Sequence, residues 1–140
     1  MTEQEIRTIL NRQREYFATG ATLSRKFRAE QLGKLKASLQ RHEEELNAAL
    51  QQDLGKSRME SYMGEIGLTL SELTWMQKHL RGLMQEKRVP TPLSQFAAIS
   101  FRSPSPYGTV LIMSPWNYPV LLTLDPLIDA IAAGLSLIHI

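Results

Sequence analysis

The segment of residues 109–134 limits the possible folds of this chain more than any other. The continuous apolar run "TVLIM" (109–113) predicts a β-strand buried on both faces, as in a parallel sheet. The largely apolar run 118–134, which Gly134 closes, predicts a helix. A parallel strand pairs across such a crossover helix with a second strand, but only residues 135–140 follow. We therefore expect that the partner strand is missing and that the α/β unit is truncated.

The preceding part of the chain, residues 1–95, is predicted to be helical. Apolar side chains recur at helical spacing up to Gly20, again over about 22–54, and again from Ser57 to the segment "KRVPTP" (87–92). Prolines in that last segment end the third helix. Two capping boxes fit the starts of the first and third helices, Thr2 with Glu5 and Ser57 with Glu60.

Residues 96–134 differ in character from the helical part. The stretch "FAAISFR" (96–102) alternates between apolar and other residues, which predicts a strand with two unlike faces. The turn-rich connector "SPSPYG" (103–108) separates it from the buried-type strand. The chain is therefore predicted to be an α/β protein with helices first and strands afterwards.

Composition excludes several classes of function. The net charge is only +2 and basic residues are interspersed with acidic ones, so no nucleic-acid partner is expected. The chain has no cysteine, which excludes disulfides, thiolate metal sites and a Cys nucleophile within these residues. His42 and His79 are isolated on predicted helices, and no metal site is expected. The N-terminus lacks the basic-then-apolar order of a signal peptide, which favours a cytoplasmic protein.

The apolar run 118–140 raises the alternative of a membrane segment. Asp125 and Asp129 near its centre would each cost about 2.5–3.5 kcal/mol on insertion scales, and Pro126 interrupts the helix. We therefore expect no membrane segment here.

The turn between the predicted strand and helix contains Asn117 between Pro115 and Pro119. Ligands of open α/β sheets bind at this end of a strand, where the next helix presents free N–H groups. Asn117 is placed either to cap the helix or to turn its side-chain N–H₂ outward as a rigid donor. Such a donor can stabilise an oxyanion, and its removal typically costs about 3–4 kcal/mol of barrier. The alternative is that Asn117 only caps and Trp116 only packs.

The sequence "PYGTVLIMSPWNYPVLLTLDPLIDAIAAG" (106–134) resembles the N-terminal part of the aldehyde dehydrogenase superfamily, on the class 3 branch that includes fatty-aldehyde dehydrogenases. "DLGKS" (53–57), "EIG" (65–67) and "KRVPTP" occur in the order and spacing of that branch. The resemblance covers residues from about 20 to 134. It implies helices, an oligomerisation-type strand in 96–102, and the first strand, turn and helix of a Rossmann-like NAD-binding domain, all within one N-terminal part (1–134).

The resemblance also implies an activity, the NAD- or NADP-dependent oxidation of an aliphatic or aromatic aldehyde to a carboxylic acid, in a homodimer. In the family the Asn of this motif donates to the oxyanion of the tetrahedral intermediate, which assigns Asn117 as catalytic. The residues before it line the cofactor, which assigns Met113, Ser114, Pro115 and Trp116 as cofactor-binding. The family's Cys nucleophile and Glu base have no counterpart here, so we expect this chain to be inactive alone. A helical interaction or oligomerisation module without enzymatic activity is the alternative.

The tail Leu135–Ile140 departs from the family pattern, which continues with an Asn, a Val-rich strand and "KPSE". These residues can be encoded by CTG TCT CTT ATA CAC ATC, the mosaic-end sequence of a common transposase sequencing adapter. We therefore expect residues 135–140 to be a non-native tail.

Overall fold

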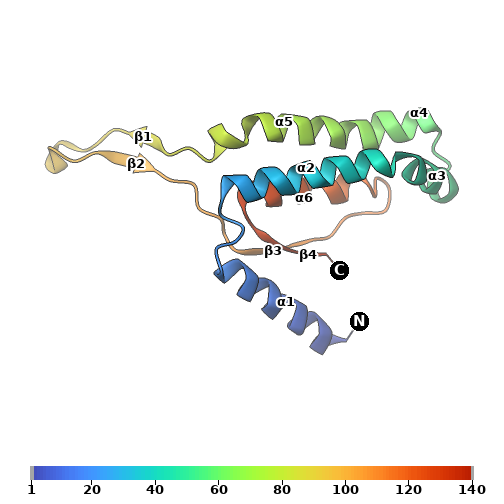
Figure 1. The fold of residues 1–140 in the computed structure, drawn as a ribbon, viewed down its shortest axis with the longest axis horizontal. Helices are drawn as coiled ribbons and strands as arrows, with labels where there is room; N and C mark the ends of the chain where they lie inside the picture. Colours follow the sequence, from blue (N-terminus) through green and yellow to red (C-terminus); the bar gives the residue numbers. More distant parts are fainter. Residues whose placement is uncertain (1, 140) are drawn as a thin grey trace.

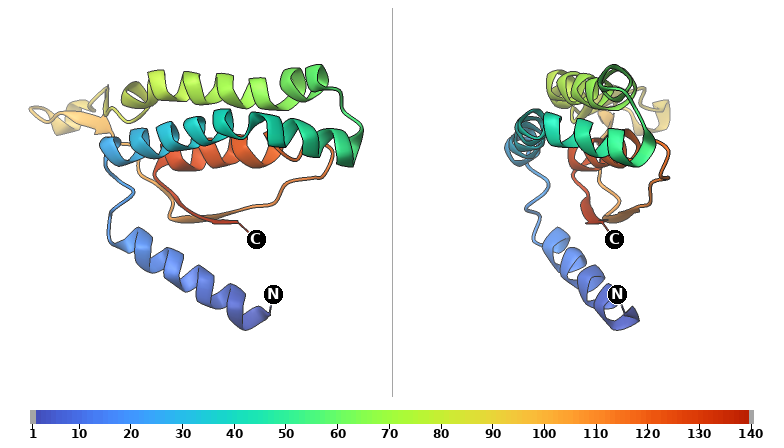
Figure 2. Two further views of the ribbon diagram at one scale, coloured as in Figure 1. Left: turned by 45° about the vertical axis from the view of Figure 1, so that its right-hand side comes forward. Right: turned by 90° about the vertical axis from the view of Figure 1, so that its right-hand side faces the viewer.

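The computed structural model describes residues 2–139, so Ile140 of the tail lies outside it. Three layers are visible in Figures 1 and 2: the helices α2, α3 and α5 above α6, the strands β3 and β4 below α6, and α1 beneath the strands. The strands β1 and β2 form an arm that projects from one end of the body. The elements are α1 (Glu3–Ala18), α2 (Arg25–Arg41), α3 (Glu43–Leu54), α4 (Arg58–Ser61), the π-helix η1 (Tyr62–Ile66), α5 (Gly67–Leu83), β1 (Lys87–Val89), the 3₁₀-helix η2 (Leu93–Gln95), β2 (Ser100–Arg102), β3 (Thr109–Ile112), α6 (Leu121–Ala133) and β4 (Ser136–His139).

The helix starts follow local capping signals. Both capping boxes that the sequence predicts are formed, at Thr2 and at Ser57. The helix predicted over 22–54 is instead two helices, which meet at His42 with φ −102° and ψ 16°. Three glutamates in the first turn of α3 favour a new helix N-terminus at this point, because acidic side chains stabilise the positive end of the helix dipole.

The hydrophobic core lies between α2, α5 and α6, and α3 and η1 each add a side chain to it. Apolar side chains from these four helices and from η1 are buried there, and each contributes roughly 1.5–3 kcal/mol relative to an exposed position. The most deeply buried of them are Leu32, Leu39, Leu50, Ile66, Leu73, Leu80 and Ile128. α6 therefore packs against α2 and α5, whereas α1 contacts β3 and β4.

Strand β3 has a parallel partner, so the expectation of a missing strand is wrong. β4 pairs with β3 from Thr109 opposite Ser136 to Ile112 opposite His139. Gly134 ends α6 with φ 78°, and the Ser136 N–H donates to the Gly108 carbonyl at 2.9 Å. The short apolar tail is therefore long enough to form a strand. The strand β3 is also only half-buried, and not buried on both faces as predicted. The α/β class is confirmed.

The projecting arm also differs from expectation. β1 lies in a segment predicted to end a helix, and it pairs antiparallel with β2 from Lys87 opposite Arg102 to Val89 opposite Ser100. The strand predicted over 96–102 is shorter because Ala97 adopts φ 77° in a turn. The arm exposes large apolar side chains, namely Leu93, Phe96, Ile99 and Phe101. In the part of the chain that the structure describes, no helix is long and apolar enough to cross a membrane.

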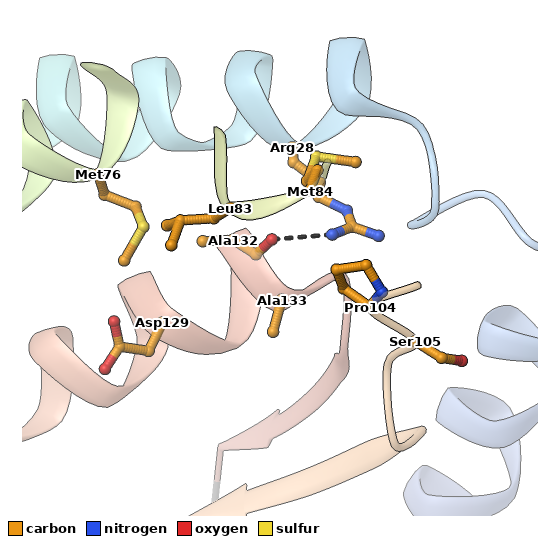
Figure 3. A pocket seen from close by; sticks show the side chains of 9 residues that line it. All are labelled: Arg28, Met76, Leu83, Met84, Pro104, Ser105, Asp129, Ala132 and Ala133. Carbon is orange, nitrogen blue, oxygen red and sulfur yellow. Dashed lines mark hydrogen bonds between the residues drawn. The ribbon is translucent and has the colours of Figure 1, made fainter. Parts of the chain in front are cut away.

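The C-terminal end of α6 is held by the loop and first turn of α2. The Arg28 guanidinium donates to the carbonyl of Ala132 at 2.9 Å (Figure 3) and to the carbonyl of Thr22 at 3.0 Å. The Thr22 hydroxyl donates to the carbonyl of Gly134 at 2.7 Å. A positive charge at this place also complements the negative end of the helix dipole. Gly134 has φ 78°, a backbone conformation that favours glycine, and a Cβ there would also force the Arg28 guanidinium to move from 2.3 Å away. Burial lowers the pKa of Arg28.

Removal of this buried guanidinium should destabilise the fold. We expect Arg28→Met to lower the free energy of unfolding by about 2–4 kcal/mol, because it leaves two buried carbonyls without their charged donor. Urea unfolding followed by circular dichroism measures the change. The control Arg25→Met removes an exposed arginine of the same helix and should change stability by less than about 0.5 kcal/mol. Equal losses in the two variants would contradict the role of Arg28.

Three acidic side chains lie close together along α5 and α6. Burial raises the pKa of Asp125, and Asp129 raises it further. Burial also raises the pKa of Glu72, with smaller contributions from Asp129 and Asp125. The Oδ1 atom of Asp125 is buried without a hydrogen-bond partner among the described residues. The folded chain therefore binds more protons than the unfolded chain above the ordinary Asp pKa of about 3.9.

Stability should accordingly be lost as the pH rises through the raised pKa of Asp125. We expect Asp125→Asn to gain stability relative to the parent at neutral pH, and to lose this advantage below the ordinary Asp pKa of about 3.9. Urea midpoints of the two proteins at a series of pH values measure the difference. A difference that does not vary with pH would show that the carboxylate charge is not responsible.

Candidate functional site

The five residues singled out from the sequence lie together in the turn between β3 and α6. Met113 is 84% exposed and Trp116 is 88% exposed, and Asn117 is exposed as well. Ser114 is half-buried, and its hydroxyl lies 2.6 Å from the Thr123 hydroxyl one turn into α6. The turn therefore presents an open surface at the carboxyl end of β3, the edge where α/β sheets bind ligands.

Asn117 does not cap α6. The helix begins at Leu121, Val120 occupies the N-cap position, and no side chain of that residue caps it. The Asn117 carboxamide makes no hydrogen bond to any residue in the range 2–139, and Trp116 is too exposed to be a packing residue. The alternative in which Asn117 only caps and Trp116 only packs is therefore wrong. The role of Asn117 as an outward-facing donor stays a prediction.

The side chain that caps α6 is Glu65, which sequence reasoning missed. Glu65 is fully buried in the π-helix η1. Its Oε2 accepts from the backbone N–H groups of Val120 (2.8 Å) and Leu121 (3.3 Å). Such a carboxylate satisfies free donors at the positive end of the helix. The sequence offered one signal, the acidic residue in "EIG" among apolar neighbours, but nothing in it points to a partner 55 residues away.

Lys56 completes the surroundings of the turn. Its Nζ donates to Glu65 Oε1 at 2.5 Å and to the backbone carbonyl of Asn117 at 2.9 Å. The same ammonium lies 3.9 Å from the centroid of the Tyr118 ring, within the range of a cation–π contact. The Lys56 side chain is only 17% exposed. The turn is thus attached to the end of α3 and to η1 by one buried ion pair.

The sequence predicted free N–H groups for a ligand at the start of α6, and this expectation is wrong. Because the N–H groups of Val120 and Leu121 already donate to Glu65, they are not free to bind a phosphate. The open part of the site is the run from Met113 to Asn117, which is exposed except at the half-buried Ser114. This surface offers apolar side chains and one free carboxamide, which suits a flat, weakly charged group better than a phosphate.

Two hollows flank α6. One, of about 470 Å³, is largely apolar and lies between α3 and the turn. It is lined by Leu46, Ala49, Leu50, Asp53, Leu54, Trp116, Pro119 and Val120. The other, of about 260 Å³, lies at the opposite end of α6 beside Arg28 and Asp129 (Figure 3). It lies next to the contacts that stabilise this end of the helix. Over residues 2–139 no group of three or more His, Cys, Asp or Glu side chains could hold a metal ion.

Comparisons with known proteins agree with this architecture. A sequence model of the aldehyde dehydrogenase family matches residues 1–139. The 4,4'-diaponeurosporen-aldehyde dehydrogenase of Staphylococcus aureus is 44% identical over 119 residues, which are 85% of this chain and 26% of that protein. Human aldehyde dehydrogenase family 3 member B1 is 44% identical over 125 residues, which are 89% of this chain and 27% of that protein.

A solved structure, the substrate-bound state of Staphylococcus aureus AldH, has a TM-score of 0.93 to this fold at 41% identity, over 96% of this chain and 29% of that one. The chain belongs to the aldehyde dehydrogenase family, and the resemblance to its class 3 branch is confirmed. The chain spans about a quarter of the length of the curated relatives it matches.

Proposed function

We propose that this chain is the N-terminal portion of an NAD- or NADP-dependent aldehyde dehydrogenase that oxidises an aliphatic or aromatic aldehyde to a carboxylic acid. The observation that carries the proposal is the free Asn117 carboxamide, exposed on a turn whose backbone a buried ion pair holds. Family membership supports the class of reaction.

In this proposal Asn117 acts on the carbonyl oxygen of the aldehyde. A Cys thiolate adds to the carbonyl carbon, and the oxygen takes up the negative charge of a tetrahedral intermediate. The Asn117 side-chain N–H₂ donates to this oxyanion and lowers the barrier to its formation. After oxidation, water hydrolyses the resulting thioester and releases the acid. Since the chain has no cysteine, we expect it to be inactive by itself.

A nicotinamide cofactor, NAD or NADP, would accept the hydride. The run of Met113, Ser114, Pro115 and Trp116 fits the nicotinamide end of such a cofactor, because it is largely apolar, adjacent to Asn117 and exposed except at the half-buried Ser114. In this role these residues orient the cofactor and keep water from the reacting carbon.

The arm of β1 and β2 supports a second part of the proposal, the assembly of a homodimer. It projects from the body and exposes Leu93, Phe96, Ile99 and Phe101. Exposed strand edges with apolar side chains invite pairing with another chain. Sedimentation of the complete subunit would reveal whether it is a dimer. If that subunit dimerises but oxidises no aldehyde, this result would favour the alternative of a non-enzymatic interaction module. As a separate proposal, we expect the protein to be cytoplasmic.

The tail 135–140 remains proposed as non-native. Its formation of β4 does not argue for a native sequence, since a short run of β-forming apolar residues after Gly134 suffices to extend the sheet. We expect re-sequencing across codon 134, from a library made without transposase, to continue into an Asn, a Val-rich strand and Lys-Pro-Ser, with a Cys further on. A stop codon directly after Ile140 would contradict this and, with it, the enzyme proposal.

The role of Asn117 can be measured in the complete gene product. We expect Asn117→Ala to lower kcat for aldehyde oxidation by about 100- to 1,000-fold, because one oxyanion donor is lost. The KM values should change little, since the free carboxamide has no structural partner in the described part of the chain. Asn11→Ala, on the exposed face of α1, is the matched control and should leave kcat unchanged. Unchanged kcat in Asn117→Ala would refute the assignment.

A further inference from the structure

The turn that carries Asn117 has few supports of its own. Its backbone hydrogen bonds to α6 begin only at Tyr118, whose carbonyl accepts from the Leu122 N–H at 3.0 Å. Ser114 is tied to Thr123 through its side chain. Over residues 2–139, the hydrogen bond that reaches Asn117 from outside the β3–α6 unit is the one from Lys56 to its carbonyl. The orientation of the Asn117 backbone, and hence of its carboxamide, therefore depends on where Lys56 is held.

Lys56 is held by charge. Gly55 ends α3 with φ 66° and directs the chain so that Lys56 follows immediately beyond the helix. Its ammonium then lies between the Glu65 carboxylate, the Asn117 carbonyl and the Tyr118 ring. A largely buried ammonium is stable only while such partners surround it. Each partner constrains the others, because all three share one nitrogen atom.

Glu65 is held by backbone geometry. It lies in the π-helix η1, and π-turns inside helices occur frequently at functional sites. Close contact fixes this turn, since a Cβ at Gly67 would lie 2.7 Å from the Tyr62 carbonyl oxygen. On the same turn, the space above Gly64 is filled by the Tyr118 ring, which a Cβ there would contact at 3.5 Å. The π-turn thus brings both the carboxylate and a flat surface to the Asn117 turn.

We propose that Lys56 and Glu65 act together as positioning residues for Asn117: the carboxylate fixes the start of α6 and the lysine, and the lysine fixes the carbonyl of Asn117. Neither residue touches the substrate in this proposal. The inference rests on the proposed oxyanion role of Asn117 and adds the groups that orient it.

The test uses the complete enzyme and a double-mutant cycle. We expect Lys56→Met to lower kcat by about ten- to a hundredfold, because a small displacement of a catalytic donor has effects of this size. The KM values for aldehyde and cofactor should stay within about twofold. In the Asn117→Ala background, Lys56→Met should lower kcat no further, since the group it positions is already absent.

Two variants serve as second probe and control. Glu65→Gln keeps an oxygen for the N–H groups of Val120 and Leu121 but loses the charge that holds Lys56, so it should lower kcat in the same direction even if Lys56→Met folds poorly. The control is Arg58→Met, two positions after Lys56 in the chain. It breaks the exposed ion pair between Arg58 and Glu44 and should leave kcat unchanged. If Lys56→Met lowers kcat by the same factor in the parent and in the Asn117→Ala background, the proposal is overturned. Parent-like kcat in both Lys56→Met and Glu65→Gln would also overturn it.

A readout without activity separates this inference from the proposed function. Amide hydrogen exchange at Val120 and Leu121 should speed up about tenfold or more in Lys56→Met and Glu65→Gln, and not in Arg58→Met. If the parent oxidises no aldehyde, the proposed function fails, while faster exchange still supports the positioning pair. Unchanged exchange in both variants would overturn the pair, whatever the parent's activity.

Discussion

The two ends of α6 are satisfied by buried charges from distant parts of the chain, and the rest of the fold depends on this arrangement. Glu65 accepts from the first N–H groups of the helix, and Arg28 donates to the Ala132 carbonyl near its end. Negative charge at a helix N-terminus and positive charge at its C-terminus are each favourable. These contacts at both ends of α6 add to its apolar packing in fixing the position of the helix.

The same arrangement connects the fold to the candidate site. If α6 were displaced along its axis, β3, the turn and Asn117 would move with it, since the turn is continuous with the helix. The carboxylate that caps the helix also binds the lysine that holds the Asn117 carbonyl. Stability and site geometry therefore share one ion pair, in which Glu65 is fully buried. Such a shared pair is sensitive to substitution, because loss of either partner leaves a buried charge uncompensated.

Features that depend on neighbouring residues could be predicted from the sequence, whereas features that depend on distant partners could not. The capping boxes at Thr2 and Ser57 are complete within four residues, and both were found. The strand–turn–helix around Asn117 was found for the same reason. Glu65 was missed because its partners are 55 and 56 residues away. The alternative in which Asn117 caps α6 is wrong because Glu65 already accepts from those donors. β4 was missed because six residues carry too short a pattern to predict a strand without knowledge of its neighbour.

The lysine beside the turn binds a backbone carbonyl and not a side chain. Every amino acid has that carbonyl, so the support does not depend on which side chain stands at position 117. The scaffold and the chemical group can therefore change independently in evolution: the turn can keep its shape while the residue it displays is replaced. A protein that lost the carboxamide would keep the geometry, and a later mutation could restore a donor in a place already prepared for it.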